Sequence, residues 1–327
     1  MNIRKEQNEI EYVRCDLCGS DSTDLYHRAR ALYGYIYGDR LFNVVRCREC
    51  GLIYVSPRLA HREWLTRYHS RAYALAANPQ DTFASKAIEQ KYLLSRIRLG
   101  QIRQFLPRGR ILDFGCGNGT FVFTALAEGW DASGIDLNEG LIKAANMYWK
   151  GHPLGESWKN ARLDPSNMLA GAAGLHRKTD RLFAASPDEF SREHAGTFDL
   201  INSSQVMEHL VSPSQTVASL ATMLAAGGWL IADVPNIRCW REIVKRGATL
   251  NPTAHLYYFD RSTIKRLMAM NGLEVVSISA RITLLGAWVK LTAMPGLKRF
   301  IPRLAGAMRF LPDAGLGSDL IVVARKK

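Results

Sequence analysis

A glycine-rich turn in the first half of the chain has the residues to hold a cofactor. Its glycines alternate with other residues: Gly115, Gly117 and Gly119. Asp113 lies two residues before the first glycine, and Asp136 ends the next run of strand character. Glycines let the backbone approach a ligand closely, and a carboxylate after the second strand of an α/β domain accepts hydrogen bonds from ribose hydroxyls. The pattern therefore indicates a site for a cofactor that contains adenosine.

The spacing of these glycines favours one class of cofactor. A dinucleotide-binding turn has glycines at its first, third and sixth positions, whereas here Thr120 takes the sixth position and the third glycine comes one residue early. The carboxylate of Asp113 would repel a pyrophosphate and attract a cation. Because S-adenosylmethionine carries a sulfonium and an amino group, the turn favours this cofactor over a dinucleotide.

Four of the six cysteines form two pairs with the spacing of metal ligands. In each pair two residues separate the cysteines and a glycine follows: Cys15 with Cys18, and Cys47 with Cys50. This spacing lets both thiolates point at one tetrahedral ion. The chain starts with a polar segment that lacks signal-peptide character, which favours zinc over disulfide bonds. Four thiolates complete the coordination of zinc, so we expect a structural rather than a catalytic metal.

Runs of strand and helix character are expected to position these residues. An apolar run at 198–202 is typical of a buried strand, and the segment 224–236 is typical of a helix end, a glycine turn and a further strand. Asp260 or Ser262 is expected to cap the N-terminus of a helix. Two closing strands are expected at 272–279 and 319–325.

In their order and in their residue sequences, these segments resemble the class I S-adenosylmethionine-dependent methyltransferases over roughly residues 86–327. The D-x-G-x-G-x-G pattern that begins at Asp113 resembles their first motif. The resemblance implies an α/β fold with a doubly wound, Rossmann-like sheet of seven strands. We expect a zinc-binding module at 1–70, a helical linker at 71–109 and the cofactor domain at 110–327.

The second cysteine pair lies in a segment, 45–58, that resembles the zinc-ribbon-like module found before some bacterial methyltransferases. Among those enzymes are C-methyltransferases of nucleotide-linked deoxysugars, in which the zinc module packs beside the active site. The segment 68–73 resembles the tyrosine-rich connection between their domains. The resemblance implies that Tyr73 covers the cofactor and contacts the substrate, with Tyr68 as the alternative.

The same resemblance assigns residues to the cofactor. The glycine turn would line the methionine and ribose, Asp136 would bind the ribose hydroxyls, and Leu137 would lie against the adenine. Ser186 follows the expected third strand, where the family usually has an acidic residue. The complete predicted cofactor set is Asp113, Gly115, Gly117, Asn118, Gly119, Asp136, Leu137, Ser186 and Ser203.

Two histidines compete for the role of general base. His209, next to Glu208, follows the fourth strand, and His255 follows the fifth. In the deoxysugar C-methyltransferases the second histidine follows a Tyr-x-Glu sequence, which is replaced here by residues 252–254, Pro-Thr-Ala. That departure leaves O-methylation open beside C-methylation. A histidine with an ordinary pKa near 6.5 can accept a proton at cellular pH.

An apolar and basic segment at 284–312 is interrupted by prolines, and we expect it to form a lid over the pocket. A peripheral membrane contact is the alternative for this lid, because basic, Trp and Leu side chains suit anionic lipid headgroups. The net charge is +13, and basic residues predominate at both ends. No apolar run is long enough to span a membrane, so we expect a cytoplasmic protein.

The sequence thus predicts a methyltransferase for a small hydroxylated metabolite, such as a sugar or a nucleotide-linked sugar, with S-adenosylmethionine and structural Zn²⁺ as cofactors. The zinc module and the basic ends also suit an RNA methyltransferase, although a dense basic and aromatic stripe is missing, which makes a nucleic-acid partner less favoured. Two further alternatives are a methyltransferase for a lipid-linked or quinone-like substrate and a non-catalytic assembly protein that binds the cofactor.

Overall fold

The computed structural model of the chain describes residues 10–30, 41–60, 82–151, 181–281 and 314–327. Tyr68, Tyr73 and the predicted lid at 284–312 lie outside the described residues. Of the predicted linker at 71–109, residues 71–81 also lie outside the described residues, and residues 82–109 lie within them. Within the described ranges, no helix combines the length and the apolar character that a membrane span requires.

The chain folds as two compact units that interleave along the sequence. The first unit contains Met1–His61, Gln205–Ser214 and Ala232–Ala324, and the second contains Arg62–Ser204, Gln215–Ile231 and Arg325–Lys327. The cysteine module therefore shares a unit with two segments far from it in sequence. The boundaries predicted at residues 70 and 109 stay predictions.

Seven strands form one sheet in the order β12-β13-β10-β9-β6-β7-β8. β6 pairs in parallel with both β7 and β9, and β7 pairs in parallel with β8. This is the Rossmann-like sheet that the sequence predicts. Its strands are β6 Arg110–Phe114, β7 Asp131–Asp136, β8 Leu182–Ala184, β9 Phe198–Ser204, β10 Leu224–Pro235, β12 Leu273–Arg281 and β13 Asp319–Lys326.

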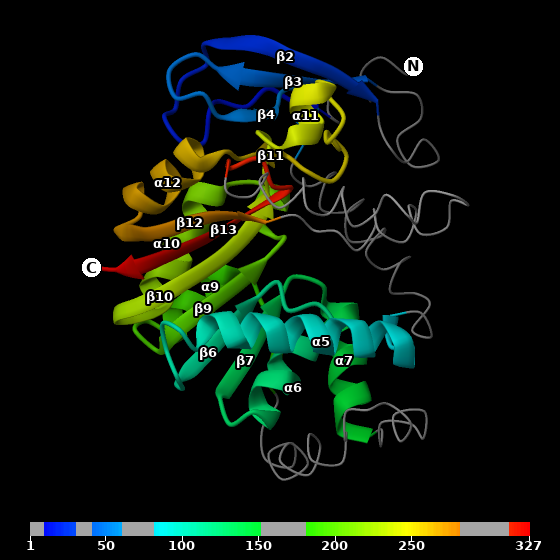
Figure 1. The fold of residues 1–327 in the computed structure, drawn as a ribbon, viewed down its shortest axis with the longest axis vertical. Coiled ribbons are helices and arrows are strands. Elements are labelled where there is room, and N and C mark those ends of the chain that lie inside the picture. Colours follow the sequence, from blue (N-terminus) through cyan, green and yellow to red (C-terminus); the bar gives the residue numbers. More distant parts are fainter. Residues whose placement is uncertain (1–9, 31–40, 61–81, 152–180, 282–313) are drawn as a thin grey trace. The chain divides into compact units, whose positions relative to one another are not determined.

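The central strand β6 buries apolar side chains on both faces, as expected of a parallel strand covered on both sides. Ile111 and Leu112 are fully buried and Phe114 nearly so. Within the second unit, α5 and α6 lie side by side (Figure 1). The helices of this part are α5 Ser85–Ile102, α6 Thr120–Ala127, α7 Glu139–Gly151 and α9 Pro187–Glu193, with α10 Pro213–Met223 continuing from the first unit.

The first unit contains a separate four-stranded sheet in the order β11-β4-β3-β2. Three of its strands come from the cysteine module and the fourth from a distant segment: β2 Thr23–Arg30, β3 Leu41–Cys47, β4 Ile53–Val55 and β11 Tyr257–Tyr258. Tyr257 pairs with Tyr54 and Tyr258 with Ile53. A short antiparallel pair, β1 Ile10–Glu11 with β5 Arg58–Leu59, completes the module.

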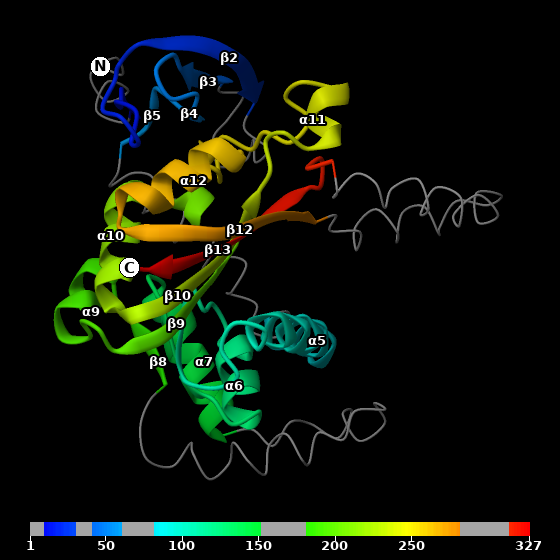
Figure 2. The same ribbon diagram turned by 60° about the vertical axis from the view of Figure 1, so that its left-hand side comes forward.

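The remaining elements of the first unit include α12 Arg261–Met270, which runs along β12 (Figure 2). Its N-cap is Asp260, one of the two predicted capping residues. The others are the 3₁₀ turn η2 Met207–His209 and α11 Trp240–Val244. The predicted glycine turn before the fifth strand is wrong in one respect. β10 already begins at Leu224, so Gly227 and Gly228 lie within the strand, where Gly227 has a φ of +72°.

Candidate functional site

The glycine turn has the backbone that the sequence predicts. Gly115, Gly117 and Gly119 have φ values of +76°, +54° and +76°, a region that L side chains rarely adopt. A Cβ on Gly119 would lie 2.6 Å from the side chain of Leu182, whereas a Cβ on Gly117 would meet nothing within 4 Å. Gly119 is therefore needed for packing, and Gly117 leaves open space where a ligand can approach the backbone.

Asp136, at the end of β7, is tied to this turn. One carboxylate oxygen accepts from the backbone N–H of Gly117 at 3.1 Å, and the other from that of Asn138 at 2.9 Å. Each carboxylate oxygen can accept a second hydrogen bond, so Asp136 can still accept hydrogen bonds from ribose hydroxyls. Leu137, the predicted adenine contact, is 42% exposed.

Asp113 belongs to a buried chain of hydrogen bonds that the sequence did not predict. The parallel register places Asp113 beside Asn202, whose side-chain amide donates to the carboxylate at 2.7 Å. Nε of Arg98, on α5, donates to the carbonyl oxygen of the same amide at 2.7 Å, and its Nη2 donates to the carbonyl of Ile231 at 3.2 Å. All three side chains are at most 7% exposed. Arg98 therefore fixes the orientation of Asn202, and Asn202 fixes the carboxylate next to the turn.

A sequence signal for Arg98 does exist. Arg98 lies on the buried side of α5, next to Leu99 and in step with Ser95 and Ile102. A charged residue at a core position of a helix needs a buried partner. The sequence does not reveal that this partner is Asn202, because the pairing depends on how α5 packs.

Three other predicted cofactor residues have structural roles in their surroundings. Asn118 receives hydrogen bonds from Thr120 at its side chain and from the Trp149 indole at its carbonyl oxygen. Ser186 is the N-cap of α9 and forms a capping box with Glu189. Ser203 is fully buried, and its hydroxyl has no hydrogen-bond partner among the described residues. Their proposed contacts with the cofactor stay predictions.

The two candidate bases lie together in the first unit. The rings of His209 and His255 are 4.9 Å apart and meet edge to face at 75°. Nδ1 of His209 is 2.6 Å from the carbonyl oxygen of Ala254. Because a carbonyl oxygen can only accept a hydrogen bond, Nδ1 carries the proton. In the neutral ring Nε2 is then the basic nitrogen, and it lies 3.7 Å from Oε1 of Glu208.

Glu208 is the most unusual titratable group of this cluster. Its side chain is 1% exposed, and neither carboxylate oxygen has a hydrogen-bond partner among the described residues. Burial, with smaller contributions from the charges of Asp233 and Asp319, raises the pKa of Glu208 to about 8. Glu208 therefore holds its proton more tightly than an ordinary carboxyl group, and its catalytic role stays a prediction.

The four cysteines of the two pairs converge. Their sulfur atoms all lie within 4.8 Å of one another, with 3.3 Å between Cys15 and Cys50 and 3.5 Å between Cys18 and Cys47. All four are free thiols. Glycine N–H groups close each turn by donating to the carbonyls of Cys15 and Cys47. Four sulfurs at these separations fit a tetrahedral zinc ion, whose Zn–S bonds are about 2.3 Å.

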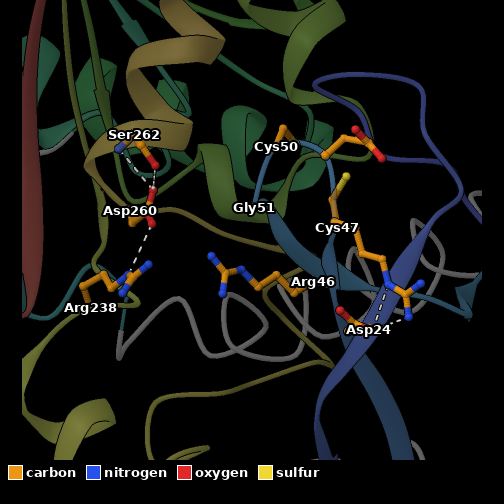
Figure 3. Close-up of a pocket in the computed structure, with 10 residues that line it drawn as sticks. Asp24, Arg46, Cys47, Cys50, Gly51, Arg238, Asp260 and Ser262 are labelled. Atoms are coloured by element: carbon orange, nitrogen blue, oxygen red, sulfur yellow. Dashed lines mark hydrogen bonds and ion pairs between the residues drawn. The ribbon is translucent and has the colours of Figure 1, made fainter.

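A pocket of about 460 Å³ lies next to the second cysteine pair. The guanidinium groups of Arg46 and Arg238 extend toward each other across it (Figure 3). Arg238 is held by Asp260, and Asp24 is paired with Arg48. Acidic and basic side chains are thus balanced around this pocket, which the sequence analysis did not predict.

A family model described as "Methyltransferase domain" matches residues 83–278, which is more than half of the chain. The chain belongs to this methyltransferase family. The match includes the glycine turn, Asp136 and both histidines, and it confirms the predicted class I S-adenosylmethionine-dependent methyltransferase.

Curated relatives of this methyltransferase include two described as "Ubiquinone biosynthesis O-methyltransferase". The protein of Thiobacillus denitrificans is 27% identical over 43% of this chain and 50% of its own length. The protein of Aromatoleum aromaticum is 32% identical over 39% of this chain and 44% of its own length. The chain thus spans about half the length of these relatives.

Solved structures support the fold. One similar structure is a chain of the complex that contains the Haloferax volcanii Trm112 methyltransferase activator. It is 15% identical, covers 78% of this chain and 96% of its own length, and has a TM-score of 0.50. At this identity the likeness concerns the fold alone, and it agrees with the Rossmann-like sheet of the methyltransferase.

Proposed function

We propose that this methyltransferase transfers a methyl group from S-adenosylmethionine to an oxygen of a small hydroxylated metabolite. The observation that carries the proposal is the glycine turn with an anchored carboxylate on each side. Asp113 is fixed by Asn202, and Asp136 is fixed by the turn itself. Fixed anions of this kind suit the cationic methionine end and the ribose hydroxyls of the cofactor.

The acceptor is proposed from two sources that agree on its size. Relatives in two bacteria are described as O-methyltransferases of ubiquinone biosynthesis, which favours a hydroxyl group on a small molecule. The resemblance of the cysteine module favours a sugar or a nucleotide-linked sugar. Both acceptors carry a hydroxyl whose proton must leave when the C–S bond breaks and the C–O bond forms.

We propose His209 as the general base for that proton. The carbonyl of Ala254 fixes the tautomer in which Nε2 is basic, and this is the arrangement that a base requires. His255, whose ring contacts that of His209, is then a neighbour that orients it.

Zinc bound by the four cysteines would have a structural role. The separations of the sulfur atoms leave no position for a further ligand once all four bind one ion. What such an ion supplies is a crosslink within the cysteine module, and no chemistry of methyl transfer depends on it.

Turnover with an isotope-labelled methyl donor tests the proposal. The purified chain is incubated with S-adenosylmethionine labelled in its methyl group and with a panel of catechols, hydroxylated sugars and nucleotide sugars. We expect one class to gain the labelled methyl group. His209→Gln should lower kcat about 100-fold while leaving the dissociation constant of the cofactor unchanged. A full rate in His209→Gln together with a loss in His255→Gln would move the base to His255.

A further inference from the structure

We propose that Asp16 and Arg58, two residues of the cysteine module, are positioning residues for the histidine pair. Both hold the segment 205–214, here called the histidine loop, and Arg58 also holds β11, which follows His255. The inference rests on the proposed function in one respect, namely that His209 is the base. The contacts themselves are independent of it, and all lie within the first unit.

Asp16 lies between the two cysteines of the first pair and binds the end of the histidine loop. Its Oδ1 accepts from the hydroxyl of Ser212 at 2.8 Å and from that of Ser214 at 3.1 Å. Its Oδ2 accepts from the backbone N–H of Ser214 at 2.7 Å. Hydrogen bonds to a charged carboxylate are stronger than those between neutral groups. One side chain between two metal-ligand cysteines therefore anchors the loop three and five residues after His209.

Arg58 binds the middle of the same loop from β5. Its side chain is 6% exposed and is paired with Glu11 at 2.9 Å. Nη1 donates to the carbonyl of Val211 at 3.0 Å and to the hydroxyl of Tyr257 at 3.2 Å. The Tyr257 hydroxyl also donates to the carbonyl of Val211, at 3.1 Å. Arg58 therefore joins a residue two positions after His209 to a residue two positions after His255.

Backbone hydrogen bonds complete the connection between the module and both histidines. The N–H of Val55, on β4, donates to the carbonyl of Leu256, and the N–H of Leu256 donates to the carbonyl of Glu208 at 2.8 Å. β4 is thus hydrogen-bonded directly to Leu256, the residue after His255. Through Leu256 it is connected to Glu208, the residue before His209. The Nδ1 contact of His209 with Ala254 depends on this same alignment.

The first residue of the histidine loop has an unfavourable backbone conformation that its surroundings maintain. Gln205 has a φ of +55°, and among the described residues it is the only non-glycine with a positive φ. Its side-chain amide donates to Asp233 and Asp319. A non-glycine residue keeps a φ in this region only where surrounding contacts hold its backbone there. The loop is thus fixed at its start by Gln205 and at its end by Asp16.

The test uses Asp16→Ala in the 327-residue chain, with Asp21→Ala as the matched control. Asp21 belongs to the same module, but among the described residues its carboxylate makes only an exposed pair with Arg14 at 4.0 Å. Three properties are compared with the parent protein: bound metal per chain, hydrogen exchange of the Ser214 amide, and the ¹³C-labelled ring signals of His209 and His255, assigned with His→Gln variants.

We expect Asp16→Ala to retain the metal content of the parent, since all four thiolates remain. Exchange of the Ser214 amide should become about tenfold faster, as expected for the loss of a charge-assisted hydrogen bond. Both histidine ring signals should shift, and kcat should fall with the dissociation constant of S-adenosylmethionine unchanged. Asp16→Asn, which keeps one acceptor oxygen, should be intermediate, and Asp21→Ala should match the parent.

Unchanged exchange and unchanged ring signals in Asp16→Ala with the metal bound would overturn the proposal. If Asp16→Ala loses metal, Arg58→Lys decides, because the side-chain partners of Arg58 in the described part of the chain are Glu11, Val211 and Tyr257 rather than a cysteine. Shifted ring signals in Arg58→Lys support the positioning role, and parental signals contradict it. The ring signals require no turnover. If the parent methylates no acceptor but the variants still show shifted ring signals, the role of His209 as a base is contradicted and the positioning role of Asp16 and Arg58 is supported.

Discussion

At the scale of single residues, Glu208 gives the clearest test of the histidine cluster. Its pKa is raised from the ordinary 4.5 to about 8, first of all by burial. At pH values between 4.5 and about 8, the folded protein therefore keeps a proton on Glu208 that the unfolded chain has lost. Stability due to this group is present below pH 4.5 and is lost as the pH rises through 8.

Glu208→Gln should flatten this pH dependence. The parent is expected to lose on the order of 2–4 kcal/mol of unfolding free energy between pH 5 and pH 9 through this group, and the variant should lack that part of the loss. Urea unfolding of both proteins at the two pH values measures the difference. Parallel pH profiles would mean that Glu208 titrates normally in the folded protein.

Arg98 is a second residue whose replacement should report on the cofactor site. Arg98→Met leaves Asn202 without its donor and frees the amide that binds Asp113. We expect a loss of about 1–3 kcal/mol in unfolding free energy and about tenfold weaker binding of S-adenosylmethionine. Arg96→Met, on the exposed side of the same helix, removes a surface ion pair with Glu128. It should change stability by less than about 1 kcal/mol and binding not at all. Equal binding by Arg98→Met and the parent would show that the buried chain does not serve the cofactor.

At the scale of elements, the cap of α12 is predicted to contribute strongly. The Asp260 carboxylate accepts from the backbone N–H groups of Ser262 and Thr263. Burial acts to raise the pKa of Asp260, but hydrogen bonds from the Thr263 N–H and from the hydroxyls of Ser262 and Thr263 lower it overall. Asp260→Ala should cost about 1–2 kcal/mol, measured by thermal unfolding. The control is Asp188→Ala in α9, where the Asp188 carboxylate makes, within the described residues, only an exposed pair with Arg192. Equal melting temperatures for the two variants would contradict the capping role.

Most of these elements could be predicted from the sequence, and the reasons are local. The strand at 131–136 and the cap at Asp260 depend on neighbouring residues, as do the positive φ values of the glycine turn. The pairing of β11 with β4 could not be predicted, because it joins residues about 200 positions apart through a strand of two residues. The start of β10 was misplaced because Gly227 and Gly228 usually mark a turn.

In the candidate site, too, features that depend on neighbouring residues could be predicted, and features that depend on long-range packing could not. The glycine turn, Asp136 and the cysteine pairs carry their chemistry in residue type and spacing, so they can be proposed from the sequence alone. The Arg98–Asn202–Asp113 chain and the contacts of Asp16 and Arg58 did not emerge, because they depend on which elements pack together. Ser186 was predicted for the cofactor from its place after the third strand, and the structure also makes it the cap of α9.

At the scale of the whole molecule, the two units divide the proposed tasks. The second unit carries the glycine turn and its two carboxylates, while the first carries the histidine pair and the cysteine module. Zinc should therefore be separable from cofactor binding. We expect one Zn²⁺ per chain by elemental analysis and its loss in Cys18→Ala, with the dissociation constant of S-adenosylmethionine changed less than about threefold. Retention of a full zinc equivalent in Cys18→Ala would contradict the four-thiolate site.

The central claim is that the turn between Asp113 and Asp136 binds the nucleoside and methionine parts of the methyl donor. Titration calorimetry of the full chain with S-adenosylhomocysteine measures this without any acceptor. We predict saturable binding of one ligand per chain in the parent and at least about tenfold weaker binding in Asp136→Ala, since a buried ribose hydroxyl would lose a charged acceptor. Absence of binding heat in the parent, or equal affinity in Asp136→Ala, would contradict the account.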